Sequence, residues 1–381
     1  MMDPASNAFQ DRAEDALSAA TRAVEAELAS IVAHRVASMS PESPLVDALT
    51  HEAEDMARME RAVEQGADDV AAASEALVGS MAEANEEWAA PMFEAAGVAY
   101  NPAPVMAILS RGGYEAAAAV RARLSTSAIG LATDAGVLPM RDAYMAIVSR
   151  AATDMAIGAA SGADAASYAV SRLLERLCGN GVRVMYASGA TRDLTSAVRA
   201  SVMATFRKTM HDARWEMGAQ FGADGVEVSA HGTCAPDHLP YQGRQMSVAD
   251  YNAANASLKR PLVDGANCRH IAFPILLGVS KPAYSEAELD AMREGSEREV
   301  TVTGLSGDPL TMTRYEATQY QRRLETMVRK EKLMAAILEK EGLDPSEHRA
   351  RARALTARYR AVSDEAELVT RGELMRVRLP R

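Results

Sequence analysis

Apolar residues recur at helical spacing along most of the chain. In residues 11–37 they fall three or four positions apart, which predicts an amphipathic helix with an acidic outer face. These positions are Ala16, Leu17, Ala20, Val24, Leu28, Ile31 and Val32. Prolines 41 and 44 interrupt this helix, because proline and the residue before it resist a helical backbone. A second helix is expected over residues 45–89, with weak points at Gly66 and Gly79 and a break at Pro91.

The middle of the chain alternates helices with short interruptions. Gly112 precedes an alanine-rich helical segment, and Gly130, Gly136 and Pro139 separate the next pieces. Further helices are expected over residues 140–158, 163–177 and 195–220. Between the last two, residues 182–186 alternate apolar and polar positions, which predicts a short strand.

Residues 225–278 depart from this helical pattern and form a compact island. Three of the seven histidines and two of the three cysteines lie within it. The run Val226-Glu-Val-Ser229 alternates apolar and polar residues, which predicts a strand with one buried face. By that alternation His231 lies on the polar side of the strand.

Two helix-start signatures follow the island. Ser285 precedes Glu288, and Thr313 precedes Glu316, at the spacing of a capping box. The helix that Thr313 opens is expected to end at Gly342, because glycine readily takes the left-handed conformation at a helix end.

Composition supports a mainly α fold with a small α+β module. Aromatic residues make up only 5% of the chain, whereas methionine occurs 21 times, and methionine and alanine favour helix over sheet. The length of 381 residues suggests two or three domains. The patterns divide the chain into extended acidic helices (1–100), a central helical region (101–181), an α+β core module that carries the island (182–311) and basic C-terminal helices (312–381).

The net charge of −11 is unevenly distributed. The first hundred residues carry about −15 and residues 311–381 about +5, which indicates either charged partners or solvated helical faces. Three cysteines provide no disulfide framework, and the first ten residues lack the basic and apolar segments of a signal peptide. No apolar run approaches the length of about 18 residues that a membrane span needs. A soluble protein that is not secreted is therefore expected.

The island offers a candidate metal site. Three residues separate Cys234 from His238, and one separates Cys268 from His270. Two sulfurs and two nitrogens could complete a tetrahedral zinc site, although the spacing of the second pair is unusual for zinc. In the alternative interpretation, the histidines bond to backbone groups and the cysteines pack as small apolar residues.

The same island could also hold one of two kinds of enzyme centre. A thiol nucleophile at Cys234 or Cys268 needs a neighbouring histidine and an orienting acid such as Asp237 or Glu227. A nuclease centre of the His-Asn-His type lacks its expected spacing, although the residue types are present as His231, His238, Asn267 and His270. Walker-type loops, dinucleotide fingerprints and H-E-x-x-H motifs are absent from the sequence. No enzymatic activity is therefore expected.

Several segments carry a resemblance to a known family. They are the run from Tyr186 to Arg199, Val226-Glu-Val-Ser-Ala-His231, Pro236-Asp-His238 with Tyr241-Gln-Gly-Arg244, Asn267-Cys-Arg-His270 with Phe273-Pro274, and the runs from Tyr284 to Leu289 and from Arg314 to Gln319. In this order they resemble the phage minor capsid protein 2 family and, more distantly, the phage Mu F-like head-morphogenesis proteins. The motif core of the resemblance is His231, His238, Gln242, Gly243, Asn267, Cys268, Arg269 and His270.

The resemblance implies a structural minor capsid protein of a tailed bacteriophage. Such a protein would assemble in the host cytoplasm, lie in the virion near the portal or the inner capsid surface, and act in head assembly or DNA packaging. Portal and major capsid proteins are the implied partners, together with self-association and packaged DNA but no membrane. No cofactor is expected apart from the open zinc alternative. The candidate DNA or partner contacts are Arg349, Arg351, Arg353, Arg358 and Arg360.

Two functional alternatives stay open beside this one. The first is a virion-carried, metal- or thiol-dependent enzyme built on residues 225–278, and the second is a DNA-binding packaging factor. The sequence departs from the family pattern at three positions. Tyr241 stands where the family usually has tryptophan, Cys234 where it commonly has alanine, and Ala235 where it usually has arginine. The departure at Cys234 argues against this residue as a required metal ligand, and the missing arginine puts any site that involves it in doubt.

Overall fold

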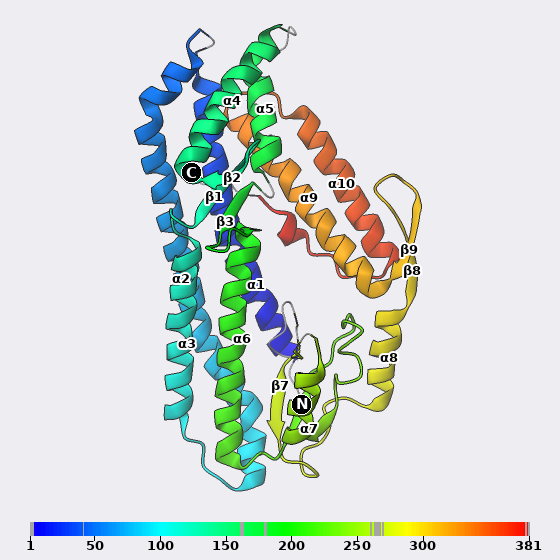
Figure 1. Ribbon diagram of the computed structural model, residues 1–381. Helices are drawn as coiled ribbons and strands as arrows, with labels where there is room; N and C mark the ends of the chain where they lie inside the picture. Colours follow the sequence, from blue (N-terminus) through cyan, green and yellow to red (C-terminus); the bar gives the residue numbers. More distant parts are fainter. Residues whose placement is uncertain are drawn as a thin grey trace.

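The computed structural model describes residues 4–40, 42–160, 164–178, 181–259, 261–262, 268, 270–377 and 379 (Figure 1). Long helices form an elongated frame, and they are α1 (Pro4–Ser38), α2 (Pro44–Ala96), α3 (Pro102–Arg123) and α6 (Leu194–Phe221). Two shorter helices, α4 (Met140–Ala160) and α5 (Ala165–Leu177), pack together at one end of this frame. The mainly α fold class with small β elements is confirmed.

Helix α2 continues through two positions where the sequence predicted weakness or a break. Pro91 lies inside the helix on its exposed side, so the backbone carbonyl that loses its amide partner there is close to solvent. The helix ends instead at Gly97, which has a φ of 66°. Gly66 is a point of close packing, because a Cβ atom there would lie 2.0 Å from Val24 Cγ2 on α1.

Helix α3 likewise includes the glycine that the sequence placed before it. Gly112 is buried in the middle of α3. A Cβ atom at this position would lie 2.0 Å from Thr209 Oγ1 on α6. The glycine therefore allows the backbones of α3 and α6 to approach each other. The prediction that Gly112 precedes the helix was wrong.

A four-stranded sheet interrupts the region that was predicted to be helical. Its antiparallel strands are β1 (Ile129–Thr133), β2 (Gly136–Pro139), β3 (Val182–Met185) and β4 (Thr191–Asp193), in the order β2-β1-β3-β4. Gly136 and Pro139 were expected only to separate helical pieces, but they belong to the β1–β2 hairpin, in which Gly136 has a φ of 108°. The predicted strand over residues 182–186 is confirmed as β3. Because β3 pairs with β1, the segments before α4 and after α5 lie side by side.

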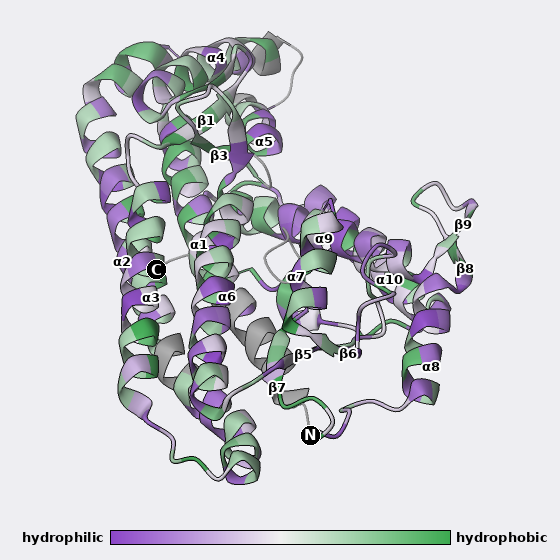
Figure 2. Ribbon diagram, turned by 60° about the horizontal axis from the view of Figure 1, so that its bottom comes forward, coloured by the Kyte–Doolittle hydropathy of each residue, from purple (hydrophilic) through white to green (hydrophobic). Residues whose placement is uncertain are grey.

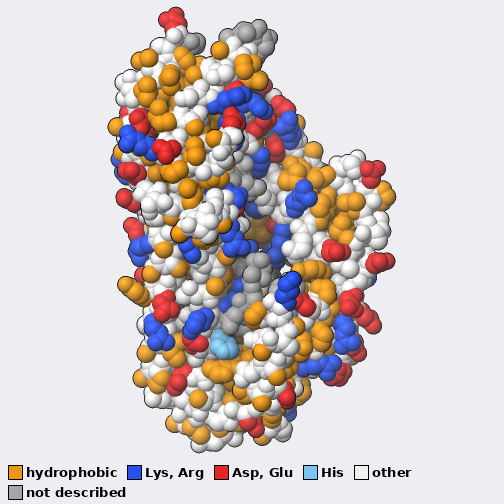
Figure 3. All heavy atoms as spheres, in the orientation of Figure 1, with side chains coloured by type: hydrophobic (Ala, Val, Ile, Leu, Met, Phe, Trp, Pro, Cys, Tyr) orange, Lys and Arg blue, Asp and Glu red, His pale blue; other side chains and the backbone are white. Residues whose placement is uncertain are grey.

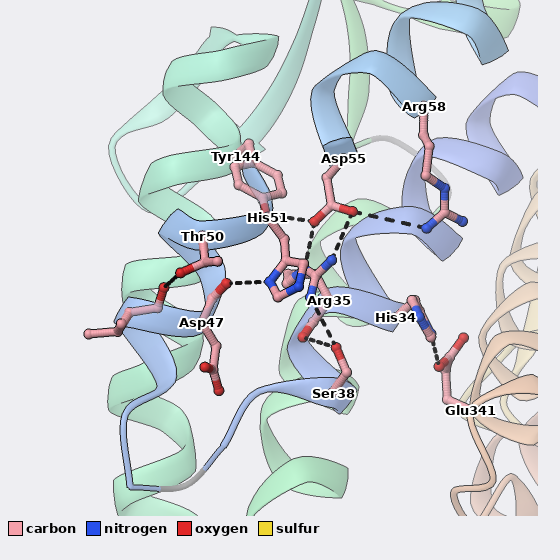
Figure 4. Close-up of polar contacts among 11 residues, drawn as sticks. His34, Arg35, Ser38, Asp47, Thr50, His51, Asp55, Arg58, Tyr144 and Glu341 are labelled. Atoms are coloured by element: carbon pink, nitrogen blue, oxygen red, sulfur yellow. Dashed lines mark hydrogen bonds and ion pairs between the residues drawn. The ribbon is translucent and has the colours of Figure 1, made fainter. Parts of the chain in front are cut away.

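A buried polar network ties α1, α2 and α4 together (Figure 4). Arg35 donates to the Asp55 carboxylate through Nε at 2.6 Å and through Nη2 at 3.3 Å. Tyr144 of α4 donates its hydroxyl hydrogen to the same carboxylate at 2.7 Å. Burial and the bond to Asp55 raise the pKa of Tyr144 well above its usual range. The hydroxyl therefore remains a donor, and one carboxylate links three helices.

A second, three-stranded sheet lies beside the lower part of the frame (Figure 1). It consists of β5 (Gly225–Val228), β6 (Gln245–Ser247) and β7 (Ala272–Ile275) in the antiparallel order β6-β5-β7, with α7 (Val248–Ser257) after β6. Aromatic contacts join it to the frame. The Trp88 ring of α2 lies 5.5 Å from the Phe273 ring of β7 and 6.3 Å from the Phe221 ring of α6, measured between centroids.

The C-terminal part is a helical pair preceded by a hairpin. The elements are α8 (Glu286–Glu297), β8 (Glu299–Thr303), β9 (Pro309–Thr313), α9 (Arg314–Lys340), α10 (Ser346–Glu365) and the 3₁₀ helix η1 (Gly372–Met375). Both predicted capping boxes are present, at Ser285 and Thr313, and Gly342 follows α9 with a φ of 71°. Figure 2 shows hydrophilic residues along much of α9 and α10. The apolar side of this pair packs into a cluster with Val300 and Val302 of β8.

Candidate functional site

The loops next to β5 and β7 bring the predicted site residues together. Val228 at the end of β5 pairs with Ala272 at the start of β7. The chain that leaves β5 and the chain that enters β7 therefore meet at the same end of the sheet. The residues that gather there are His231, Cys234, His238, Cys268 and His270. All are buried except His231, which is half-buried.

His270 lies at the centre of this group. Its Nε2 atom is 3.4 Å from Cys234 Sγ and 3.4 Å from Gln242 Oε1. Its Nδ1 atom is 3.3 Å from Cys268 Sγ, which in turn is 3.5 Å from His238 Nδ1. The other three predicted metal ligands are thus gathered near the His270 ring, with Cys234 at one nitrogen and Cys268, which contacts His238, at the other.

The possible ligand atoms fall into two groups that share His270. One group is His238, Cys268 and His270, all buried, and the other is His231, Cys234 and His270. Within each group the ligand atoms lie within 4.8 Å of one another. In the part of the chain that the structure describes, the four predicted ligands do not form a single group at that spacing.

The surroundings keep the His270 ring neutral. Burial lowers the pKa of His270 to about 2, and the nearby His231 and His238 rings act in the same direction. A neutral imidazole carries one N–H and one free lone pair. Gln242 Oε1 is an acceptor on the Nε2 side, so a proton on Nε2 leaves the Nδ1 lone pair on the side of Cys268.

Gly243 fixes the turn that follows Gln242. Its φ is 69°, and a Cβ atom there would lie 2.1 Å from Leu289 Cδ2. Its N–H donates to the Val228 carbonyl oxygen at 2.7 Å. Gln242 is buried, and its Oε1 accepts a hydrogen bond from the His231 N–H at 3.2 Å. Two members of the predicted motif core therefore hold the loop that carries His231.

Residues distant in the sequence also support this loop. Ser296 Oγ accepts from the Cys234 N–H at 3.3 Å, Tyr284 Oη accepts from the Ala230 N–H at 3.2 Å, and Arg314 Nη1 donates to the Gly232 carbonyl oxygen at 3.2 Å. None of these three side chains was predicted as part of the site. The only sign of their role in the sequence was that Tyr284 and Arg314 begin two of the segments that carry the family resemblance.

Comparison with known protein families identifies this chain. Residues 10–364 match the family described as phage minor capsid protein 2. The chain belongs to this family. No curated protein and no solved structure matches it. The family assignment gives this minor capsid protein a structural role in the phage virion, in association with other virion proteins. Among the described residues, no helix has the length and apolar character required to cross a bilayer.

One sequence prediction about the site of the minor capsid protein was wrong. Strand β5 is buried on both faces, with Glu227 2% exposed, and Ser229 directly after the strand is 4% exposed. The reason is that the following chain covers the polar side. The Glu227 carboxylate accepts from the Ala283 N–H at 2.9 Å and from Gln245 Nε2 at 2.8 Å, and Ser229 Oγ accepts from the Ile271 N–H at 2.9 Å.

Both candidate thiols of the enzyme alternative have a histidine neighbour, Cys234 beside His270 Nε2 and Cys268 beside His270 Nδ1 and His238 Nδ1. Asp237 Oδ2 lies 4.0 Å from His238 Nε2, beyond hydrogen-bond distance. The other candidate acid, Glu227, already accepts hydrogen bonds from Ala283 and Gln245. Two residues of the predicted motif core, Asn267 and Arg269, lie outside the described residues. Asn267 is also one of the residues of the nuclease alternative.

The five arginines of α10 differ in their surroundings. Arg349 pairs with Glu339 at 2.6 Å, and Arg351 pairs with Glu347 on its own helix. Arg353 and Arg360 line a groove between α9 and α10. No ion pair of Arg353, Arg358 or Arg360 is found within the described ranges.

A large charged cavity was not predicted from the sequence. It has a volume of about 650 Å³, lies between α1, α6, α9 and η1, and is lined by both arginines and carboxylates. Figure 3 shows Lys and Arg side chains around a hollow in the middle of the face that it presents. Glu25 accepts hydrogen bonds there from the Thr195 N–H at 3.2 Å and from its hydroxyl at 3.0 Å. Burial and the neighbouring Asp193 raise the pKa of Glu25 to about 8.

Proposed function

We propose that this minor capsid protein acts in head assembly while bound to the portal or to the inner capsid surface. The observation that carries the proposal is an apolar patch at the first turns of α2, formed by Leu45, Val46 and Leu49, which are 42%, 62% and 49% exposed. Their spacing places them on adjoining parts of one helix surface. Exposed apolar residues that gather in one place are typical of protein–protein interfaces.

The charge of the surrounding segment favours a protein partner over DNA at this patch. The first hundred residues carry about −15. A surface of this sign is repelled by nucleic acid and attracted to a basic protein surface. We therefore assign the patch to the portal or the major capsid protein, with self-association as the alternative within the same class of contact.

The proposal is tested in the phage that encodes the chain. Tagged wild-type protein should be present in purified DNA-filled heads and should co-purify with portal or major capsid protein. The variant Val46→Asp should fold as the wild type does but lose this association, because it places a charge in the apolar contact. Val279→Asp is the matched control, since Val279 is also 62% exposed but lies outside α2. Absence from purified heads, or full association of Val46→Asp, would contradict the proposal.

A DNA contact on α10 is the second candidate function. The specific observation is that Arg353 and Arg360 face one groove and have no ion pair among the described residues. Removal of one arginine–phosphate interaction should lower the salt dependence of duplex binding by about one unit of slope. Arg353→Gln combined with Arg360→Gln should therefore weaken the binding of the full chain to duplex DNA, whereas Arg351→Gln, which removes an arginine paired with Glu347, should not. Binding that is absent or independent of salt would eliminate this function.

A further inference from the structure

We propose that His238, Cys268 and His270 bind one Zn²⁺ ion in this minor capsid protein. The zinc site is independent of the role in head assembly, because it rests only on the side chains at the end of the β5–β7 pair. The three residues are buried, and their possible ligand atoms lie within 4.8 Å of one another.

The distances match the edges of a zinc coordination tetrahedron. Zinc binds sulfur at about 2.3 Å and imidazole nitrogen at about 2.0–2.1 Å, so a sulfur and a nitrogen on one tetrahedral ion are about 3.5 Å apart. Cys268 Sγ lies 3.3 Å from His270 Nδ1 and 3.5 Å from His238 Nδ1. Both sulfur–nitrogen separations therefore already match those that the ion requires.

The outer contacts of His270 fit the same assignment. A histidine that binds a metal through one ring nitrogen usually donates the N–H of the other to a carbonyl or carboxylate oxygen. His270 Nε2 faces the amide oxygen of Gln242 at 3.4 Å, and Gln242 is itself 3% exposed. The Gln242 side chain therefore favours the tautomer in which His270 Nδ1 is free to bind the ion.

Cys234 lies outside this ligand set. Its Sγ atom is 3.4 Å from His270 Nε2, on the opposite nitrogen from Cys268. The three protein ligands leave a fourth coordination position, which we assign to solvent. On binding, Cys268 loses its thiol proton to solvent and coordinates as thiolate, and one soft sulfur with two imidazoles selects zinc over magnesium or calcium.

The bound ion would join two chain segments. His238 belongs to the loop between β5 and β6, whereas Cys268 and His270 precede β7. Among the hydrogen bonds that hold these segments is the contact of the Gln242 amide oxygen with both His231 and His270. A zinc ion at this point would add a cross-link between these two loops.

The experiment uses full-length chain purified without a polyhistidine tag. Elemental analysis should find one zinc per chain in the wild type, with nearly all of it lost in Cys268→Ser and in His238→Ala. Cys234→Ser should keep its zinc, and so should Cys178→Ser, which changes a buried cysteine in the frame core. Circular dichroism of each variant establishes that it is folded.

A cobalt titration of metal-stripped wild type provides a second measurement that does not depend on a variant. Cobalt bound to one thiolate should produce a sulfur-to-metal charge-transfer band, and the band should persist in Cys234→Ser. A wild type that neither contains zinc nor develops this band overturns the proposal. Loss of zinc from Cys234→Ser overturns the assignment of ligands, whether or not Cys268→Ser also loses it.

Discussion

Arg35 Nε donates a hydrogen bond of 2.6 Å to Asp55 Oδ2, in a place where neither residue is more than 8% exposed. Replacing Asp55 with alanine leaves the Arg35 guanidinium buried without its counter-charge, and Tyr144 loses its acceptor. We expect Asp55→Ala to lower the free energy of unfolding by about 3–5 kcal/mol, as measured by urea denaturation.

An exposed ion pair provides the comparison for that loss. Arg121 pairs with Asp68 at 3.3 Å, and both side chains are more than half exposed. Asp68→Ala should change the free energy of unfolding by less than about 1 kcal/mol. The double variant Arg35→Met with Asp55→Leu should recover much of the stability lost in Asp55→Ala, since no buried charge remains unpaired. If Asp55→Ala and Asp68→Ala lowered the free energy of unfolding equally, the buried ion pair would contribute no more to stability than the exposed one.

Glu25 should make the stability of the protein depend on pH. Its pKa is raised from 4.5 to about 8 in the folded chain, so between these values the folded state holds a proton that the unfolded state has released. Stability therefore falls as the pH rises from 4.5 to about 8, by at most about 1.4 kcal/mol per pH unit for one proton. Thermal unfolding across this range should show the trend in the wild type.

Glu25→Gln should flatten this trend, because glutamine resembles the protonated carboxyl and does not titrate. Glu60→Gln, at an exposed position of α2, should leave the trend as it is in the wild type. A wild type whose melting temperature rises through the same pH range would mean that other groups dominate.

Gly112 should be intolerant of a side chain. Gly112→Ala places a Cβ atom 2.0 Å from Thr209 Oγ1, and the resulting overpacking should cost about 1–3 kcal/mol despite the better helix propensity of alanine. Adding Thr209→Ala should restore part of the loss by making room. Gly295→Ala on α8 is the control, since no atom lies within 4 Å of a Cβ atom at that position. That variant should be stabilised by up to about 1 kcal/mol, and destabilisation of both variants by the same amount would refute the packing explanation.

Replacing Gly243 with alanine should destabilise the protein more than the same change at Gly189, another glycine with a positive φ. Gly189 has a φ of 80° with no atom within 4 Å of a Cβ atom, so Gly189→Ala meets only the backbone cost of about 1–2 kcal/mol. Gly243→Ala meets that cost and in addition a clash with Leu289, with a Cβ distance of 2.1 Å to Cδ2. Differential scanning calorimetry should rank Gly243→Ala as the less stable, and a reversed order would count against the clash.

The sequence predicted the bounds of α4, α5 and α6 to within about two residues, but it misplaced the end of α2 and the start of α3. Helical spacing and capping signals depend on neighbouring residues, and both capping boxes appear in the structure. Pro91 and Gly112 misled the prediction because their effects depend on what surrounds each residue in the folded chain. Pro91 is tolerated on an exposed helix side, and Gly112 packs against Thr209. The β1–β2 hairpin was missed because its strands are short and each contains a glycine, Gly130 or Gly136, that also fits a linker between helices.

The candidate site was predictable in its residues but not in its arrangement. Spacing in the sequence brought Cys234 near His238 and Cys268 near His270, which suggested two pairs. Antiparallel pairing of β5 with β7 decides instead which residues face each other across space. That register sets Cys268 beside His238 and divides the two cysteines between the nitrogens of His270, a division that no local pattern contains.

Helix α2 has 53 residues and is therefore about 80 Å long. Its first turns carry the exposed residues Leu45 and Val46, and near its other end Trp88 contacts Phe273 of the sheet that borders the histidine and cysteine cluster. One continuous helix therefore separates these exposed apolar residues from the sheet beside the cluster by most of its length. A partner bound as proposed at the first turns of α2 would stand at a fixed distance from the small sheet, because the helix between them is unbroken.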